Sequence, residues 1–146
     1  MRGMARGFIA AVVWLAIGSV AHGGEPTLKV ADAWVPAAEK VGADVPLLLT
    51  IRNEAETEDA LLRARCPVAN FSERHTVDRG EGAPAMRSVR SIPIVAAGTT
   101  ILKADGYHIM LLQTRQPLAV GEKFTCAIDF QKAGTIETEV NVRNLP

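Results

Sequence analysis

The sequence predicts an all-β sandwich or barrel, and three observations lead to this prediction. Short β-rich or alternating runs of apolar residues recur through most of the chain. Gly, Pro, Asn and Asp separate these runs at short intervals. No segment shows a sustained helical period with capping residues. Several short strands at regular spacing are typical of antiparallel sandwiches and barrels.

The expected strands begin at residue 28. The second reads as a buried strand that ends at Asn53, the third stops before Pro67, and Asp105-Gly106 forms a turn before the seventh. The last alternates apolar and polar residues, as a half-buried antiparallel strand does. The segment 36–44, PAAEKVGAD, is expected to form at most one helical turn. The strands are expected at 28–35, 45–53, 60–66, 71–77, 86–94, 99–104, 107–113, 123–130 and 135–142.

The first residues predict an export signal rather than part of the fold. Arg2 and Arg6 precede the apolar run FIAAVVWLAIGSVA, and small residues follow before the polar HGGEP. This is the order of a secretory signal peptide, and the apolar run is short for a bilayer span. We expect a signal peptide over 1–23, cleaved after Ala21 or Gly23, and one mature domain over 24–146. An uncleaved anchor is the alternative, and a lipid anchor on cysteine is not expected because no cysteine lies near this region.

The charge balance argues against two classes of partner. The chain has 16 basic and 16 acidic residues and a formal net charge of zero. Nucleic acids and acidic membrane surfaces both favour a basic excess. Neither is therefore expected as a partner.

The two cysteines, Cys66 and Cys126, are expected to be structural. In an exported domain an even pair first indicates a disulfide, which would close a long loop here. Two buried free thiols and a pair of copper-binding thiolates are the alternatives. No C-x-x-C motif is present, so thioredoxin-type redox chemistry has little support.

The histidines and methionines beyond the signal peptide are few. Within the predicted strands they are His75, Met86, His108 and Met110. His108 and Met110 are two residues apart on one strand, so their side chains point to the same face. The loop between His75 and Met86 contains glycine and proline and can fold back. From the residues alone, both an ordinary core strand and half of a metal site remain open for 108–110.

The types of these four residues would select the metal. Thioether sulfur is neutral and soft, so it favours Cu(I) over Zn²⁺, Mg²⁺ or Ca²⁺. Two imidazoles and two thioethers also avoid thiolates, which oxidise outside the cytoplasm. A blue-copper site would need a Cys among the ligands, and Cys126 has no His or Met close by in the sequence. Electron transfer is therefore disfavoured.

From about Val30 to Val142 the chain resembles the periplasmic copper chaperone family PCuAC. The family motif His-x10-Met-x21-His-x-Met matches at all four positions. The segments CPVA, AMRSV, GYHIMLL and FQKAG are also similar to sequences of the family. The resemblance implies a cupredoxin-like Greek-key β-sandwich. It also implies Cu(I) bound near the surface by His75, Met86, His108 and Met110, and delivery of that copper to the copper A site of cytochrome c oxidase.

Two departures from the family pattern affect this expectation. Many members have a further Met where this chain has Pro84, so an additional soft donor is lost there. Some members carry a His- and Met-rich tail, whereas this chain ends at Pro146, so one copper per chain is expected.

The expected protein is a monomeric periplasmic carrier and not an enzyme, because no nucleophile triad, phosphate loop or carboxylate pair stands out. One alternative is a non-catalytic secreted sandwich that serves copper storage, copper tolerance or protein–protein interaction. A second is a copper-dependent oxidase or a thiol oxidoreductase, which would need an open redox-active site or a reactive pair of cysteines.

Overall fold

The structure is a computed structural model, and it describes residues 27–80 and 82–146. The expected signal peptide therefore lies outside the described residues. No helix in the described part of the chain is long and apolar enough to cross a membrane. The ten strands are β1 (Leu28–Pro36), β2 (Val45–Asn53), β3 (Asp59–Arg65), β4 (Ala69–Asp78), β5 (Ala85–Ser88), β6 (Ile92–Ile94), β7 (Gly98–Ile101), β8 (His108–Thr114), β9 (Lys123–Phe130) and β10 (Gly134–Arg143).

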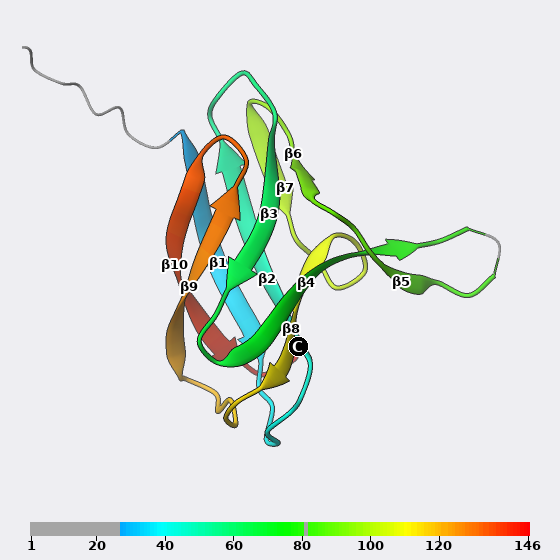
Figure 1. The fold of residues 1–146 in the computed structure, drawn as a ribbon, viewed down its shortest axis with the longest axis vertical. Coiled ribbons are helices and arrows are strands. Elements are labelled where there is room, and N and C mark those ends of the chain that lie inside the picture. The colour runs from blue at the N-terminus through cyan, green and yellow to red at the C-terminus, as the bar shows by residue number, and fades with distance from the viewer. Residues whose placement is uncertain (1–26, 81) are drawn as a thin grey trace, which may run out of the picture.

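The strands form an all-β fold in which β2 joins two layers (Figure 1). The strand order is β5-β4-β8-β2-β1-β10-β9-β3-β6, and β7 also pairs with β2. The first part of β2, from Val45, pairs with β8, whereas its last residues, up to Asn53, pair with β7. A strand that changes partners along its length is how sandwich layers meet at a corner. The predicted all-β class is confirmed.

The core lies between these layers and follows the period-2 pattern of the strands. In β2, Val45, Leu47, Leu49 and Ile51 are buried and alternate with more exposed residues. Strand β10 shows the predicted single wet face, because its apolar positions are buried or half-buried while Glu137 and Glu139 are exposed. Burial of these aliphatic side chains provides the main driving force for folding.

The β4–β5 ribbon is a prominent feature outside this core. Strand β5 lies at one edge of the strand order, with all four of its residues exposed. Figure 1 shows the ribbon extending away from the body of the sandwich. Its β4 strand is held to the body by pairing with β8. The predicted fold-back between His75 and Met86 is present as this hairpin.

Two local predictions were wrong. The run 86–94 is two strands, because Arg90 lies in a bend where the chain leaves β4 and turns to pair with β3. Tyr107 was placed in the expected strand 107–113, but it precedes β8 and is 38% exposed. Segment 36–44 agrees with the expectation of at most one helical turn, since the chain turns at Val41 and Gly42 while Ala38 bridges to Leu118.

A disulfide joins Cys66, just after β3, to Cys126 in the middle of β9. Cys126 is fully buried and Cys66 nearly so. The bond links two segments 60 positions apart, so it greatly restricts the unfolded chain. It lies in the core, where it reinforces the pairing of β3 with β9.

Candidate metal centre

Strand pairing brings the two predicted histidine ligands side by side. His75 on β4 lies directly opposite His108 on β8, and Glu73 lies opposite Met110. Directly opposed residues, and residues two apart on one strand, share a face of the sheet. His75, His108 and Met110 therefore project from the same face. The sequence could place His108 and Met110 together but could not show which strand lies next to them.

The remaining predicted ligand, Met86, is on the same face but further out. On β5 it is opposite Val77, while Ser88 is the residue opposite His75. Met86 and Met110 thus lie on opposite sides of the His75–His108 row. One ion held by all four side chains requires the β4–β5 ribbon to curl toward β8, or the long Met86 side chain to extend across the row.

The two imidazole rings are at a separation that a shared ion permits. Their centroids are 5.7 Å apart, and their planes are nearly perpendicular, at 86°. A metal–nitrogen bond of about 2 Å puts an ion roughly 3 Å from each centroid, so ligating rings have centroids up to about 6 Å apart. The pair in this structure satisfies that limit.

The four side chains differ strongly in exposure. His108 is only 1% exposed, and the His75 side chain is 13% exposed. Met110 is half-buried, whereas Met86 is 59% exposed. The site was expected near the surface, but its His108 side is buried. Met86 is therefore the most exposed of the four.

Hydrogen bonds select which nitrogen each ring leaves available. His108 Nδ1 donates to the Gly106 carbonyl at 2.9 Å, so a neutral His108 ring carries its lone pair on Nε2. His75 Nε2 donates to the Glu73 carboxylate at 2.9 Å, which leaves the lone pair on Nδ1. His75 Nδ1 is buried, and among residues 27–80 and 82–146 it has no hydrogen-bond partner. Buried polar atoms normally have a partner, so this nitrogen suits a metal ligand.

Glu73 is the charged group closest to these ligands. The hydrogen bond from His75, and then the one from Ser88, hold the pKa of the Glu73 carboxyl below its usual range. The carboxylate is therefore ionised at neutral pH. It gives the otherwise neutral set of two imidazoles and two thioethers one nearby negative charge, which favours a cation.

Sequence reasoning did not single out Glu73 or Ser88. The signal for Glu73 was present in the sequence, because it lies two residues before His75 and so shares its strand face. Ser88 had no comparable signal, since its position opposite His75 depends on the register of the hairpin.

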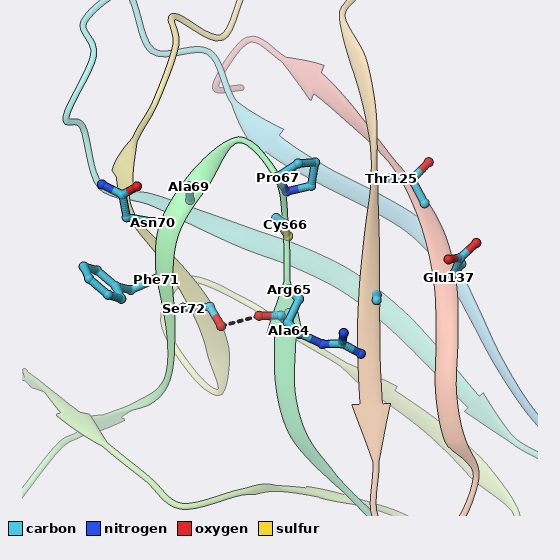
Figure 2. Close-up of a pocket in the computed structure, with 11 residues that line it drawn as sticks. Ala64, Arg65, Cys66, Pro67, Ala69, Asn70, Phe71, Ser72, Thr125 and Glu137 are labelled. Atoms are coloured by element: carbon cyan, nitrogen blue, oxygen red, sulfur yellow. Dashed lines mark hydrogen bonds between the residues drawn. The ribbon is translucent and has the colours of Figure 1, made fainter.

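In the described residues no group of three or more His, Cys, Asp or Glu side chains is placed to hold a metal ion. A groove of about 480 Å³ lies beside Cys66. Figure 2 shows the residues that line it, which come from the β3–β4 turn, β9 and β10. Arg65, Phe71 and Glu137 are among its lining residues, and none of the four predicted ligands is.

A family model for "LpqE-like: Putative lipoprotein LpqE-like" matches residues 28–142. The chain belongs to this family. A related protein, "Putative lipoprotein Lxx21020" from Leifsonia xyli subsp. xyli, is 27% identical over 119 residues, which is 80% of this chain and 70% of the relative. The cysteines of this chain are Cys66 and Cys126, and both are in the disulfide.

Solved PCuAC domains have the same fold. The copper-bound PCuAC domain from PmoF2 has a TM-score of 0.69 at 17% identity, covering 82% of this chain and 94% of that domain. The apo PCuAC domain from PmoF1 has a TM-score of 0.68 at 19% identity, with coverage of 82% and 95%. The solution structure of CuI-DR1885 from Deinococcus radiodurans has a TM-score of 0.62 at 26% identity, with coverage of 79% and 78%. The resemblance to PCuAC is confirmed at the level of fold.

Proposed function

We propose that this LpqE-like protein is a carrier of Cu(I), which it binds through His75, Met86, His108 and Met110. The observation that carries the proposal is the pairing of His75 with His108 across β4 and β8, which puts the two imidazole rings close together. Within the described residues, Nδ1 of His75 is buried there without a hydrogen-bond partner. Met110 and Met86 project from the same face and supply soft donors. Copper-bound solved structures of the same fold support the choice of metal.

The donor set suits transfer better than catalysis. Two imidazoles and two thioethers are neutral, and thioethers prefer Cu(I). A recipient rich in thiolates binds Cu(I) more tightly than thioethers do, so copper passes from this chain to such a site. The exposed Met86 is the ligand that a recipient meets first, and it is the natural first ligand to be exchanged. The carrier needs no enzymatic step.

The place and partner of this carrier complete the proposal. Residues 1–23 act as a secretory signal peptide, and the mature domain, 24–146, works as a monomer in the periplasm. The lipoprotein descriptions of the family and of its relative are in keeping with export. The recipient is the copper A site of cytochrome c oxidase, or another thiolate-rich copper protein, and nucleic acid has no role.

Cu(I) titration of the mature protein under anaerobic conditions tests the proposal. We expect one Cu(I) per chain, and X-ray absorption with two nitrogen and two sulfur neighbours. The double variant Met86→Leu with Met110→Leu keeps the apolar volume but removes both thioethers. Its affinity should fall by more than about 100-fold, the upper end of the loss that follows removal of an outer-shell partner.

The matched control is a pair of leucine-to-methionine changes away from the ligand face, such as Leu62→Met with Leu145→Met, both exposed positions. This control keeps one Cu(I) of unchanged affinity. Wild-type affinity in the Met86→Leu, Met110→Leu protein would overturn the ligand assignment. Tight Cu(I) binding that a thiolate-rich acceptor cannot remove would favour storage over delivery.

A further inference from the structure

The Glu73 carboxylate links His75 to the edge strand. Its Oε2 accepts the hydrogen bond from His75 Nε2 at 2.9 Å and one from the Ser88 hydroxyl at 3.2 Å. The strand register makes these three side chains neighbours, since Ser88 lies opposite His75 and Glu73 is two residues before it. One oxygen atom therefore ties a β4 imidazole to β5, the strand that carries Met86.

This arrangement determines how the His75 ring is presented. A carboxylate can only accept a hydrogen bond, so the proton of the neutral ring is on Nε2 and the lone pair is on Nδ1. A free imidazole has no such restriction and exchanges between its two tautomers. His108 has the opposite tautomer, because the Gly106 carbonyl accepts a hydrogen bond from Nδ1 and the proton is therefore on Nδ1.

We propose that Glu73 is a positioning residue that fixes His75 in the tautomer that binds through Nδ1, so that the ion is held between Nδ1 of His75 and Nε2 of His108. Ligating histidines commonly donate their second N–H to a carboxylate or a carbonyl, which orients the ring and strengthens it as a ligand. Both partners are present here, a carboxylate for His75 and a carbonyl for His108. This inference rests on the proposed function.

Glu73 also has an electrostatic part in this arrangement. Four neutral ligands leave the single positive charge of Cu(I) uncompensated within the site. The Glu73 carboxylate lies one imidazole ring away from Nδ1 and offsets that charge without occupying a coordination position. Ser88 orients the carboxylate, and through it the site is coupled to the position of the β4–β5 ribbon.

The tautomer of His75 can be measured directly in the copper-free protein. Long-range ¹H–¹⁵N NMR of the imidazoles should show His75 protonated on Nε2 and His108 protonated on Nδ1. In Glu73→Ala the His75 signals should become those of a tautomer mixture, while the His108 signals stay unchanged. The exposed acid Glu139 on β10, which pairs with Lys123, provides a control, and Glu139→Gln should leave both rings as in the wild type.

Cu(I) competition titrations give the second readout. Glu73→Ala should weaken Cu(I) binding by about 10- to 100-fold, as loss of such partners does at other metal sites. Glu73→Gln retains a hydrogen-bond acceptor and loses the charge, so its affinity should lie between Glu73→Ala and the wild type. Ser88→Ala should have a smaller effect in the same direction, and Glu139→Gln none.

Three results would overturn the inference. The first is an unchanged His75 tautomer together with wild-type affinity in Glu73→Ala. The second is a metal-shifted His75 Nε2, rather than Nδ1, in the Cu(I)-loaded protein. The third is an oxygen neighbour in the X-ray absorption that disappears in Glu73→Ala, because Glu73 would then be a ligand itself. If the wild-type protein binds no Cu(I), both the proposed function and this inference fail. If it binds Cu(I) with two nitrogen and two sulfur neighbours, the proposed function stands and the three results above test the role of Glu73 alone.

Discussion

Two carboxylates in this molecule, Asp129 on β9 and Glu73 on β4, have contrasting surroundings. Asp129 uses both oxygens: it accepts hydrogen bonds from the Thr135 hydroxyl at 2.6 Å, from Arg63 Nε at 2.6 Å and from Arg65 at 3.0 Å. Glu73 uses one oxygen, shared by His75 and Ser88. Both carboxyl pKa values are lowered, chiefly by the Thr135 hydrogen bond at Asp129 and by the His75 hydrogen bond at Glu73.

The two carboxylates differ in whether the side chains that donate to them keep a polar atom without a hydrogen bond. The arginine partners of Asp129 connect β3 to β9, and its threonine partner connects the start of β10 to β9. The disulfide also links β9 to the residue just after β3. The His partner of Glu73 keeps a buried nitrogen without a partner. Such an atom costs about 1–3 kcal/mol, so it is a feature that folding alone does not favour. The comparison is consistent with the proposed function, in which the β3–β9–β10 region serves stability and the β4–β8 region carries the proposed copper ligands.

Removing the disulfide should have the largest effect on stability. Cys66→Ala with Cys126→Ala should lower the free energy of unfolding by about 4 kcal/mol, because the bond closes a long loop in the unfolded chain. Urea denaturation measures this loss. At urea concentrations below its denaturation midpoint, the folded variant should still bind one Cu(I). An unchanged denaturation midpoint, or a loss of copper binding by the folded protein, would break the proposed division between the two regions.

The two histidines should respond differently to truncation. His108→Ala should cost about 2 kcal/mol in unfolding free energy, because it removes a fully buried, hydrogen-bonded ring and leaves a cavity. His75→Ala should cost less than about 1 kcal/mol, since the lost ring contains the unpartnered Nδ1. Thermal unfolding compares the two, and both variants should lose most Cu(I) affinity. Equal destabilisation would mean that the burial of the unpaired nitrogen has no cost.

Asp129 should contribute stability only where it is ionised. Asp129→Asn should lower the free energy of unfolding by about 1 kcal/mol at neutral pH, as loss of a small, mostly exposed network of ion pairs does. Because the pKa of Asp129 is lower in the folded chain than the value of about 3.9 in an unfolded one, its contribution is present above that value. It is lost as the pH falls through the folded-state pKa.

The measurement for Asp129 is chemical denaturation of the wild type and Asp129→Asn from neutral to strongly acid pH. The two stability curves should converge at the acid end, while Cu(I) affinity at neutral pH stays unchanged. A constant difference across the whole range would contradict a role that depends on the ionised carboxylate.

The exposed Met86 should have the smallest effect on stability. Met86→Leu should change the free energy of unfolding by less than about 0.5 kcal/mol, since the side chain is 59% exposed on an edge strand. It should nevertheless weaken Cu(I) binding, and less than Met110→Leu does, because Met110 is on β8 two residues from His108 and diagonal to His75. Competition titrations of the two single variants rank them, and the reverse order would place Met86 at the centre of the site.

Much of the local structure was predictable because it depends on local patterns. The alternation in β2 and β10 follows from the two-residue period of a strand, and the structure retains it. The common face of His108 and Met110 follows from the same period. The single run predicted over 86–94 was wrong, because each half of it pairs with a different strand, a choice that local propensity does not make.

The sequence by itself determined an all-β chain and a spacing of two His and two Met that points to Cu(I). Only the tertiary structure decided that β4 lies beside β8, that His108 is buried, and that Glu73 holds one nitrogen of His75. The physical reason is the range of the interactions. Side-chain alternation is set by the backbone within one strand, whereas register and burial are set by which distant strands pack together. The proposed metal site lies at such a pairing, so its residues could be predicted from the sequence, whereas their arrangement in space could not.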